Sequence, residues 1–588
     1  MIQELKTRIA EAFKSLYQAE VNTADVKLEQ TNKEFEGDFT FVVFQYLKLS
    51  RQKPEDTAQA LGQFVSEKDE RIASFNVVKG FLNFTLSASY WTQFLENVFS
   101  KKLPDIPAVQ PRSIMVEYSS PNTNKPLHLG HVRNNLLGFS ISQILSYVGH
   151  TVQKVNLIND RGIHICKSML AYKMFGNDET PEAAEMKGDH LVGKYYVMFD
   201  QVYKEEIKSL MAEGKTEDEA KAASELMRQA REMLLQWEEH HEQTRALWEK
   251  MNGWVYKGFE QTYGRMGVSF DNYYYESQTY LLGKEMVIAG CDAGVFYRKE
   301  DQSIWVDLTD DGLDHKLLLR PDGTSVYITQ DIGTAHKKYE DFKSDDSIYV
   351  VGNEQDYHFK VLKLIMQKLG EPGAEGIQHM SYGMVELPDG KLKTREGKVV
   401  DADNLMDEMN ATAKERTEEQ GKTEGMEQEE LKALYETLGM GALKYFLLKV
   451  DPAKRILFNP SDSIDFQGNT GTFIQYTYAR CKSILNVRTP ENSGSYSLEL
   501  EPSERELIVH FHDFGDKMVE AAAGLSPAVV TAYLYETAKA YNSFYNQCTI
   551  LKADDEEQVN FRLILTAVAA NIMKQCAELL GMQMPERM

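Results

Sequence analysis

Residues 114–158 constrain the fold more than any other part of this chain. Residues 114–118 form an apolar run of strand length, residues 119–126 are dense in turn formers, and apolar side chains then recur at helical spacing up to residue 148. Gly149 is suited to end that helix, and residues 152–158 form a second apolar run. This order predicts a βαβ unit, and therefore a parallel sheet with a right-handed crossover.

The rest of the chain divides around this unit. Residues 1–105 mix helical and strand-like patterns, and three prolines between residues 103 and 111 indicate a linker. We therefore expect an N-terminal α+β domain at 1–105, an α/β Rossmann-type parallel-sheet domain at 106–430, and an all-α helical-bundle domain at 431–588. Polar helical patterns predict an insertion at about 176–300. Short strands are expected at 294–297, 304–306, 326–328 and 348–351.

Composition excludes several classes of protein. With 588 residues and 42% hydrophobic residues, the chain is typical of a globular protein. Its five cysteines are scattered and never spaced CxxC, which argues against a structural zinc ribbon or a disulfide framework and favours the cytoplasm. No apolar stretch is long enough for a membrane span, and the N-terminus does not have the pattern of a signal peptide.

The loop before the first predicted Rossmann helix carries the strongest chemical signal. It reads His128-Leu129-Gly130-His131, directly after a strand and at the start of a helix. A helix N-terminus offers unpaired amide donors and a positive dipole end, so it can hold a phosphate. Two imidazoles there could donate hydrogen bonds to phosphate oxygens that gain charge in a transition state. The alternative is that both histidines only cap the helix.

This motif resembles the first signature of the class I aminoacyl-tRNA synthetases. The longer run with Glu117, Ser119-Ser-Pro-Asn122 and Lys125 resembles the arginyl-tRNA synthetase family, and the resemblance extends over nearly the whole chain. It implies an arginine–tRNA ligase that uses L-arginine, ATP with Mg²⁺ and tRNA(Arg), without a structural zinc ion or other metal site. We expect a monomer that does not bind membranes.

A basic loop at residues 390–398 resembles the second class I signature. Lys391, Lys393 and Arg395 could neutralise the departing pyrophosphate. Thr394 stands where the general pattern has a second lysine, and the resemblance implies that Lys125 compensates. A solvated hairpin tip is the alternative for this loop.

A segment at residues 320–332 resembles the amino-acid pocket of the family. Strand alternation would place Tyr327, Thr329 and Asp331 on one face. Because a guanidinium is a planar cation with five donors, Tyr327 and Asp331 are sensible acceptors for it. The alternative is a half-buried strand followed by a capping aspartate. The resemblance adds Gln355 and three residues near the histidine motif to the arginine site: Glu117, Ser120 and Asn122.

Residues outside the catalytic domain resemble the family's tRNA-contacting domains. Asp38 and Phe84 belong to the N-terminal match, and aromatic side chains beside arginines could stack on splayed anticodon bases in the C-terminal match. The C-terminal candidates are Gln475, Tyr476, Arg480 and Met588. An aromatic stripe at helical spacing is more often core, which is the alternative for these residues.

We therefore expect two steps, activation of arginine to an adenylate and transfer to the terminal adenosine of tRNA, with activation stimulated by tRNA. The expected catalytic residues are His128, His131, Lys125, Lys391 and Lys393, and the expected ATP-binding residues are His128, Leu129, Gly130, His131, Lys391, Lys393 and Arg395. Three alternatives remain open: a synthetase for another amino acid, a non-catalytic tRNA-binding homologue, and a nucleotidyltransferase that shares the histidine motif.

The net charge of −24 argues at first against an RNA partner. However, residues 176–250 and residues 401–440 each carry a formal charge of −8, whereas residues 111–175 carry +5 and residues 441–490 carry +4. The acidity is thus concentrated in the insertion and a connecting segment. We expect tRNA to follow the two basic segments and to avoid much of the insertion.

Overall fold

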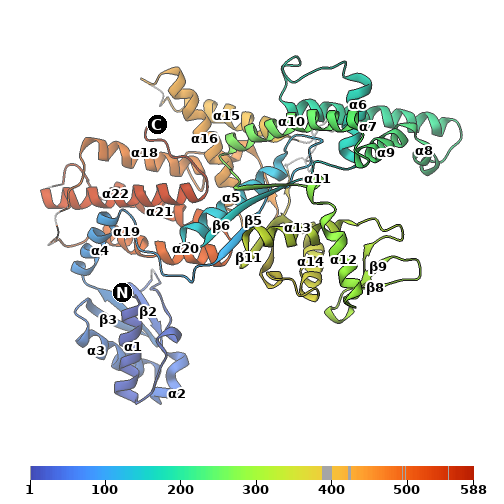
Figure 1. Ribbon diagram of the computed structural model, residues 1–588. Helices are drawn as coiled ribbons and strands as arrows, with labels where there is room; N and C mark the ends of the chain where they lie inside the picture. The colour runs from blue at the N-terminus through green and yellow to red at the C-terminus, as the bar shows by residue number, and fades with distance from the viewer. Residues whose placement is uncertain are drawn as a thin grey trace.

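The structure is a computed structural model that describes residues 2–32, 34–386, 400–421, 425–492, 494, 496, 498–553 and 555–588. Figure 1 shows the N-terminal unit in blue, the central sheet, the insertion helices in green, and the C-terminal helices in orange and red. Among the described residues, no helix combines the length and the apolarity that a membrane crossing requires.

The N-terminal unit is an antiparallel sheet covered by helices. Its strand order is β1-β2-β4-β3. Leu5, Ile9 and Phe13 recur every four residues in the first helix and are buried, so one face of that helix packs on the core. The elements are α1 (Ile2–Tyr17), β1 (Leu28–Gln30), β2 (Phe39–Val42), α2 (Leu47–Ser50), α3 (Pro54–Lys68), β3 (Ile72–Val78), β4 (Phe81–Leu86) and α4 (Ala88–Lys101).

The central sheet is fully parallel, in the order β12-β11-β5-β6-β7, which confirms the predicted fold class. Both faces of β5 are buried: Ile114 and Val116 enter one hydrophobic core and Met115 enters a second. The chain runs outward from β5 through β6 to β7, then restarts on the other side of β5 with β11 and β12. The strands are β5 (Ser113–Glu117), β6 (Thr151–Ile158), β7 (Asn272–Tyr275), β11 (Asp346–Gly352) and β12 (Ile377–Tyr382).

Long helices fill the predicted insertion, but the chain rejoins the sheet earlier than residue 300. Strand β7 pairs in parallel with β6, so residues 272–275 already belong to the Rossmann core. After β7 come a small antiparallel sheet and the helices that cover the second core. The helices up to β7 are α5 (Leu129–Tyr147), α6 (Ile163–Phe175), α7 (Gly188–Ala212), α8 (Glu217–Ala223), α9 (Glu225–Glu238) and α10 (Glu242–Met266). The later elements are α11 (Glu276–Thr279), α12 (Leu282–Asp292), β8 (Tyr297–Arg298), β9 (Ile304–Val306), β10 (Lys316–Leu319), α13 (Tyr327–Phe342) and α14 (Asp356–Lys368).

The predicted strand at residues 326–328 is wrong, because α13 begins at Tyr327. A run of three residues is too short to distinguish a strand from the first turn of a helix. The longer pattern is helical, since Ile328, Ile332 and Ala335 are all buried against the second core. Gly283 of α12 lets this helix approach closely, because a Cβ there would lie 1.6 Å from the Thr329 carbonyl oxygen.

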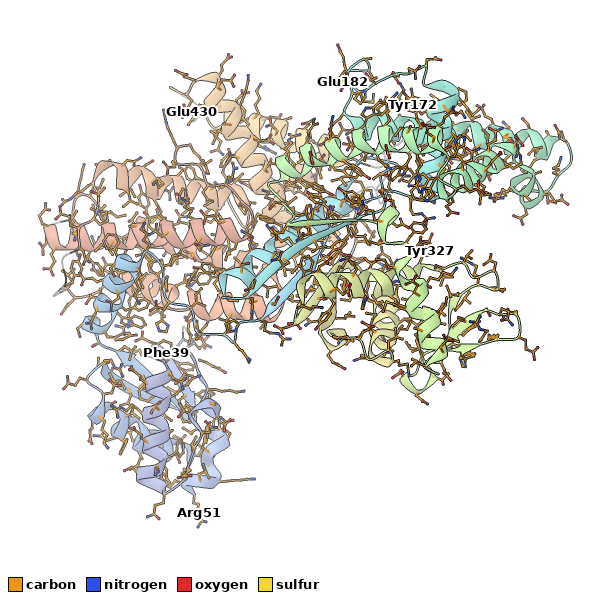
Figure 2. All side chains as sticks on the ribbon, in the orientation of Figure 1. Phe39, Arg51, Tyr172, Glu182, Tyr327 and Glu430 are labelled. Carbon is orange, nitrogen blue, oxygen red and sulfur yellow. The ribbon has the colours of Figure 1, made fainter. Side chains whose placement is uncertain are left out.

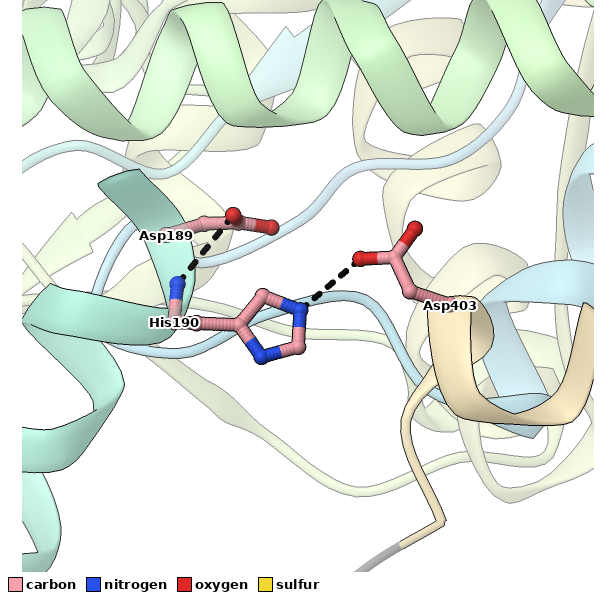
Figure 3. Close-up of side chains that lie close together, drawn as sticks. All are labelled: Asp189, His190 and Asp403. Carbon is pink, nitrogen blue, oxygen red and sulfur yellow. Dashed lines mark hydrogen bonds and ion pairs between the residues drawn. The ribbon is translucent and has the colours of Figure 1, made fainter. Parts of the chain in front are cut away.

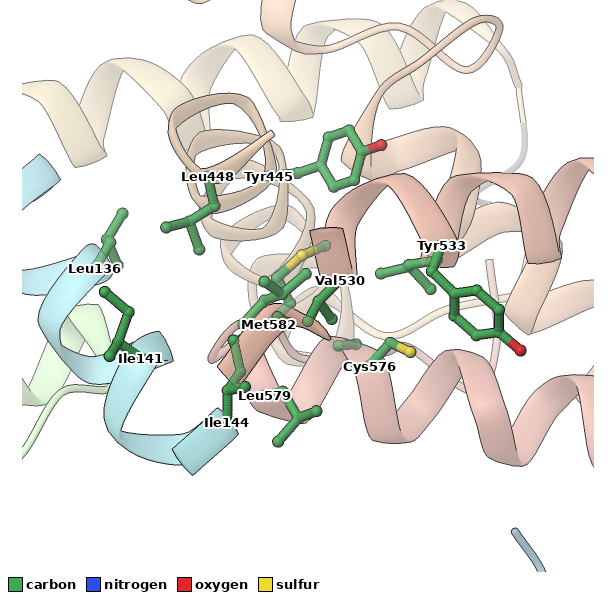
Figure 4. Close-up of a cluster of buried hydrophobic side chains, with 14 of the residues drawn as sticks. Leu136, Ile141, Ile144, Tyr445, Leu448, Val530, Tyr533, Cys576, Leu579 and Met582 are labelled. Carbon is green, nitrogen blue, oxygen red and sulfur yellow. The ribbon is translucent and has the colours of Figure 1, made fainter. Parts of the chain in front are cut away.

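Helices form the C-terminal region and pack directly on α5. Figure 4 shows Ile141 and Ile144 of α5 beside Leu448, Val530 and Leu579. The elements are β13 (Val385–Glu386), α15 (Ala402–Glu419), α16 (Gln428–Leu448), β14 (Ile456–Leu457), α17 (Pro460–Ser463), α18 (Gly471–Val487), α19 (Pro502–His512), α20 (Phe514–Ala523), α21 (Pro527–Gln547) and α22 (Glu556–Leu579).

Arg133 of α5 ties these parts together. Its side chain is fully buried. Nη1 donates to the carbonyls of Gly383 and Met384, and Nη2 donates to those of Pro452 (3.1 Å) and Lys454 (2.9 Å). Burial lowers the pKa of this guanidinium to about 10, which still leaves it charged at neutral pH. One cation therefore joins α5, the end of the sheet and the entry to the C-terminal helices.

We predict that Arg133→Met lowers the free energy of unfolding by about 3 kcal/mol, because buried carbonyls lose their donors. The midpoint of urea unfolding measures the change. Arg228→Met is the control, since Arg228 is an exposed arginine of α9 and its substitution should leave the midpoint unchanged. Equal midpoints for Arg133→Met and the unsubstituted protein would contradict the role of Arg133.

Candidate active site

Polar side chains gather at the carboxyl edge of the central sheet. Glu117 ends β5, Asp160 follows β6, Glu276 follows β7, and Gln355 follows β11. The chain order of the strands reverses between β5 and β11, and open parallel sheets bind ligands at such a point. The edge between these two strands is therefore the candidate active site.

The loop that leaves β5 is strained and firmly held. Ser119 and Ser120 both have positive φ, 79° and 45°. The Ser119 amide donates to Asn134 Oδ1 (2.5 Å), and the Ser120 amide donates to Asn156 Oδ1 (3.1 Å). Asn134 also donates to the Val350 carbonyl of β11 (2.7 Å). Sequence reasoning missed these two asparagines, which fix the path of the loop.

His128 and His131 close the N-terminus of α5. His128 Nδ1 accepts from the Gly130 amide, and His131 Nδ1 accepts from the His128 amide, each at 3.2 Å. The two rings lie 3.9 Å apart between centroids. Because each Nδ1 is an acceptor, each ring carries its proton on Nε2, where it can be donated to a ligand. A Cβ at residue 130 would lie 3.0 Å from the His128 ring, so glycine leaves room for it.

Burial sets the charge of these groups. It lowers the pKa of His128 to about 4, with the Lys125 charge adding to the shift. Burial and the charges of His128 and Lys125 hold the pKa of His131 well below its ordinary value. Burial also lowers the pKa of Lys125. At neutral pH the site therefore offers two neutral donors beside one ammonium group.

The backbone amides at the start of α5 are used within the protein. Leu129 donates to the Val400 carbonyl (3.2 Å), and Gly130 donates to His128. These two amides are paired in this conformation, and the binding of ATP by Leu129 and Gly130 stays a prediction. The side chains of His128, His131 and Lys125 remain as donors. Lys391, Lys393 and Arg395 lie outside the described residues.

The carboxyl groups of Asp331 and Glu276 form the other half of the site. Tyr327 and Asp331 lie one helical turn apart on α13, and Tyr327 is 79% exposed on the side of its lobe that faces the insertion helices (Figure 2). The Asp331 carboxylate is hydrogen-bonded to His358 Nε2 at 2.6 Å. Burial raises the pKa of Glu276 to about 7; Arg161 opposes the shift, and the charges of Asp160 and Asp331 add to it.

Glu276 is a site candidate that sequence reasoning missed. Its signal is its place directly after the strand Asn272–Tyr275, at the carboxyl edge of the sheet. Gln355 is exposed at the same edge. The carboxyl groups of Glu276 and Asp331 suit a cationic ligand better than an anionic one. Tyr327 and Gln355 are their neighbours at this edge.

The remaining predicted arginine-site residues differ in their surroundings. Glu117 is buried and forms an ion pair with the buried Lys338 of α13. Ser120 is partly buried, and its carbonyl accepts from Asn159 Nδ2 (3.1 Å). Asn122 is exposed. Ser120 and Asn122 can therefore meet a ligand, whereas the charge of Glu117 is already compensated by Lys338.

Three of the predicted tRNA contacts have no surface for RNA. Phe84 is part of the N-terminal core, and Gln475 donates to two carbonyls inside the helical region. Asp38 is buried between domains, where Arg505 of α19 donates to both of its oxygens (3.0 and 2.6 Å). Each of these side chains holds the protein together in this conformation, so direct contact with tRNA by these residues stays a prediction that their burial disfavours.

Arg480 marks a better surface on the helical region. Its guanidinium lies 5.0 Å from the Tyr476 ring centre and 4.7 Å from that of Tyr545, and all three side chains are partly accessible. Met588 packs partly buried against the core. Two aromatic faces around one cation form a surface on which unpaired bases can stack.

A cleft of about 1190 Å³ lies elsewhere, between the N-terminal unit and α19–α21. Its lining holds two basic residues, Arg505 and Lys517, but more acidic ones. The acidic residues are Glu36, Asp38, Asp451, Glu506, Asp513, Glu520 and Glu536. Such a lining repels phosphate, so this cleft is not the candidate site for a nucleotide.

Comparisons with known proteins point to the same family along the whole chain. Family models match residues 3–86 (arginyl tRNA synthetase N terminal domain), residues 95–459 (tRNA synthetases class I (R), catalytic domain) and residues 474–588 (DALR anticodon binding domain). An arginine–tRNA ligase of Bacteroides thetaiotaomicron is 52% identical, and one of Parabacteroides distasonis is 51% identical; each match covers 100% of this chain and 99% of the relative. The fold resembles the arginyl-tRNA synthetase of Thermus thermophilus, with a TM-score of 0.80, 24% identity and full coverage of both chains.

We predict that His128 and His131 stay neutral, as the Nε2–H tautomer, from about pH 8 to about pH 5.5, because their pKa values are depressed. NMR of the protein with ¹⁵N-labelled histidine measures this, and single His→Asn variants assign the two signals. Since the unfolded chain binds these protons more tightly, stability should fall as the pH drops from 6.5 toward 4. Protonation of either ring near pH 6.5 would contradict the geometry.

Proposed function

The chain belongs to the arginyl-tRNA synthetase family, and we propose that it is an arginine–tRNA ligase that charges tRNA(Arg) in protein synthesis. The observation that carries the proposal is the division of the site. Neutral and cationic donors stand at the start of α5, and the carboxylates of Glu276 and Asp331 stand at the same edge of the sheet. One half suits triphosphate, and the other suits a guanidinium group.

The first step joins arginine to the nucleotide. A carboxylate oxygen of arginine attacks the α-phosphorus of ATP, the bond to the bridging oxygen breaks, and pyrophosphate leaves with its electron pair. His128 and His131 donate their Nε2–H groups to phosphoryl oxygens that gain charge, and Lys125 attracts the pyrophosphate. ATP enters as its Mg²⁺ complex, in which the ion neutralises phosphate charge. Lys391, Lys393 and Arg395 act on pyrophosphate by family resemblance.

The second step transfers the arginyl group. The 2′-hydroxyl of the terminal adenosine, by class I analogy, attacks the carbonyl carbon of the adenylate and loses its proton; an ester forms and AMP leaves. No covalent bond to the protein is needed, so the protein contributes positioning and electrostatic stabilisation. We expect tRNA to stimulate the first step as well.

Arginine recognition depends on acceptors. The guanidinium is placed against Asp331 and Glu276, with Tyr327 and Gln355 beside it, and Asp331 exchanges His358 for the substrate. Ser120 and Asn122 face the backbone of the amino acid, with Glu117 behind them. Amino acids without a matching cation cannot pair with these partly buried carboxylates, which favours arginine without an editing domain.

The proposed domain roles follow the same division. Residues 1–105 contact tRNA, residues 106–430 carry the chemistry, and residues 431–588 bind the anticodon, where Arg480 and Tyr476 are the proposed stacking residues. We place the enzyme in the cytoplasm, acting as a monomer and without structural zinc.

We predict that the purified protein charges tRNA with arginine, and with no other amino acid, when ATP and Mg²⁺ are supplied. His128→Asn should lower kcat by about 10²–10³-fold, because asparagine retains an acceptor for the helix cap but lacks the Nε2–H donor. His240→Asn, in the exposed turn between α9 and α10, is the control and should leave kcat unchanged. Charging with a different amino acid would contradict the assignment.

A second prediction concerns pH. Because the pKa of Glu276 is about 7, the carboxyl ionises as the pH rises through neutrality and then attracts the guanidinium. The KM for arginine should therefore fall between about pH 6 and pH 8. In Glu276→Gln this KM should be about tenfold higher and independent of pH over that range, while the KM for ATP is unchanged. A wild-type KM for arginine that is flat over this range would contradict the role of Glu276.

A further inference from the structure

The helical insertion holds one carboxylate of α15 with three side chains. Asp403 accepts from Lys187 Nζ, pairs with His190 Nε2 at 2.8 Å, and accepts from Thr262 Oγ1 at 3.1 Å. Lys187 and His190 lie at the start of α7, and Thr262 lies on α10. Figure 3 shows the imidazole of His190 directed at Asp403 across the space between α7 and α15.

The segment that Asp403 anchors is paired with the histidine motif. The Leu129 amide donates to the Val400 carbonyl (3.2 Å), and the Ala402 amide donates to the Leu127 carbonyl (2.8 Å). These bonds form an antiparallel bridge between His128 and residue 401. The carboxylate is thus two residues from the backbone partner of His128, and a shift of α15 would move the N-terminus of α5.

Helix α7 also touches the other side of this loop. A Cβ at Gly193 would lie 2.8 Å from Pro126 Cδ and 3.6 Å from Lys125 Cα, so only a glycine allows this approach. At the start of α7, a Cβ at Gly188 would lie 2.3 Å from the Trp254 carbonyl oxygen of α10. Helices α7 and α10 therefore form one tightly packed support, and the loop from Lys125 to His128 rests against it.

The Lys187 ammonium occupies the space between the two carboxylates of this cluster. Asp189, His190 and Asp403 have ligand atoms within 4.8 Å of one another, a spacing that metal sites share. However, the Lys187 ammonium contacts Asp403 and lies 3.3 Å from Asp189, so it stands where a metal ion would have to bind. Burial favours the protonated form of Asp403, but hydrogen bonds from His190 and Lys187 outweigh it and lower the pKa to about 2.

We propose that the insertion is a brace for the catalytic loop, and that Lys187, His190 and Thr262 are positioning residues that act through Asp403 on Lys125 and His128. This proposal rests on the proposed function, since it gives the insertion a part in adenylate formation. The brace acts on the phosphate half of the site. The proposed guanidinium acceptors are Glu276, which follows β7, and Asp331 on α13, and the contacts of Asp403 include neither element.

The test measures each half separately. ATP–pyrophosphate exchange, with tRNA present, gives kcat and the two KM values for the unsubstituted protein, Lys187→Gln and Asp403→Asn. We expect kcat to fall about tenfold and the KM for ATP to rise about tenfold, because small displacements of catalytic groups are costly. The KM for arginine should stay unchanged. Lys187→Arg retains the cation and should restore most of the activity.

Matched controls separate positioning from a general loss of structure. Lys194 lies on the same helix and pairs at 2.7 Å with Glu179, a residue of the insertion itself, so Lys194→Gln should behave as the unsubstituted protein. Thr262→Val removes one hydroxyl at nearly constant volume, and it should shift the KM for ATP in the same direction if the larger changes prevent folding. Thermal unfolding midpoints of all variants are recorded in parallel.

Two outcomes would overturn the brace. One is an unchanged KM for ATP and unchanged kcat in folded Lys187→Gln, Asp403→Asn and Thr262→Val. The other is a lower kcat with both KM values constant and a lower unfolding midpoint, which indicates structural damage alone. The affinity for ATP, measured by calorimetry, separates the two proposals. If the unsubstituted protein binds ATP but does not activate arginine, the proposed function is wrong. The ATP affinities of the variants still test the brace in that case.

Discussion

The buried guanidinium of Arg133 is the constraint on which the arrangement of the molecule depends. A charge without a carboxylate partner is costly inside a protein unless hydrogen bonds compensate it, and both terminal nitrogens of Arg133 donate to carbonyls. Here the carbonyls come from residues 383–384, at the end of the sheet, and from residues 452–454, at the entry to the helical region. These segments also pair with each other through β13 and β14. The helix that presents His128 and His131 is therefore fixed against both neighbours by the same side chain.

The acidic surplus of the chain has a structural use. Much of it lies in the insertion and in residues 401–440, and ion pairs link these two regions: Lys187 with Asp403, and Arg265 of α10 with Asp407 and Glu436. The carboxylates of α15 and α16 thus hold the insertion in place. The net charge of −24 is a sum over the whole chain and hides the positive segments at 111–175 and 441–490, which is why it is a poor guide to whether the protein binds RNA.

The elements predicted well from sequence are those with long, regular patterns. The run of residues 114–158 contains a strand, a turn and a full helix, and these alone imply the parallel sheet. The start of α13 could not be predicted, because three β-branched or aromatic residues fit a strand as well as a helical turn. Tyr327 and Asp331 nevertheless share a face. Residues four positions apart lie on the same side of a helix, and they also lie on the same side of a strand, where side chains alternate.

Candidate site residues could be named from the sequence where they belong to a motif. They could not be named where only contacts in the folded protein identify them. Asn134 and Asn156 act through contacts with Ser119, Ser120 and Val350 that only the fold brings together, and the one signal for Glu276 is its place directly after β7. Asp38, Phe84 and Gln475 show the reverse. Their sequence surroundings resemble tRNA-contacting segments, but these side chains are buried in contacts within the protein.

The Asp38–Arg505 pair determines how the N-terminal domain can move. Arg505 donates to both oxygens of the buried Asp38 carboxylate, so separating the two residues would leave that carboxylate without its cation. The pair therefore favours the docked position of the N-terminal domain. While it is docked, the span between the outer surface of the N-terminal domain and the Arg480 surface is a constant length. An RNA that contacts both of these surfaces at once must span that length.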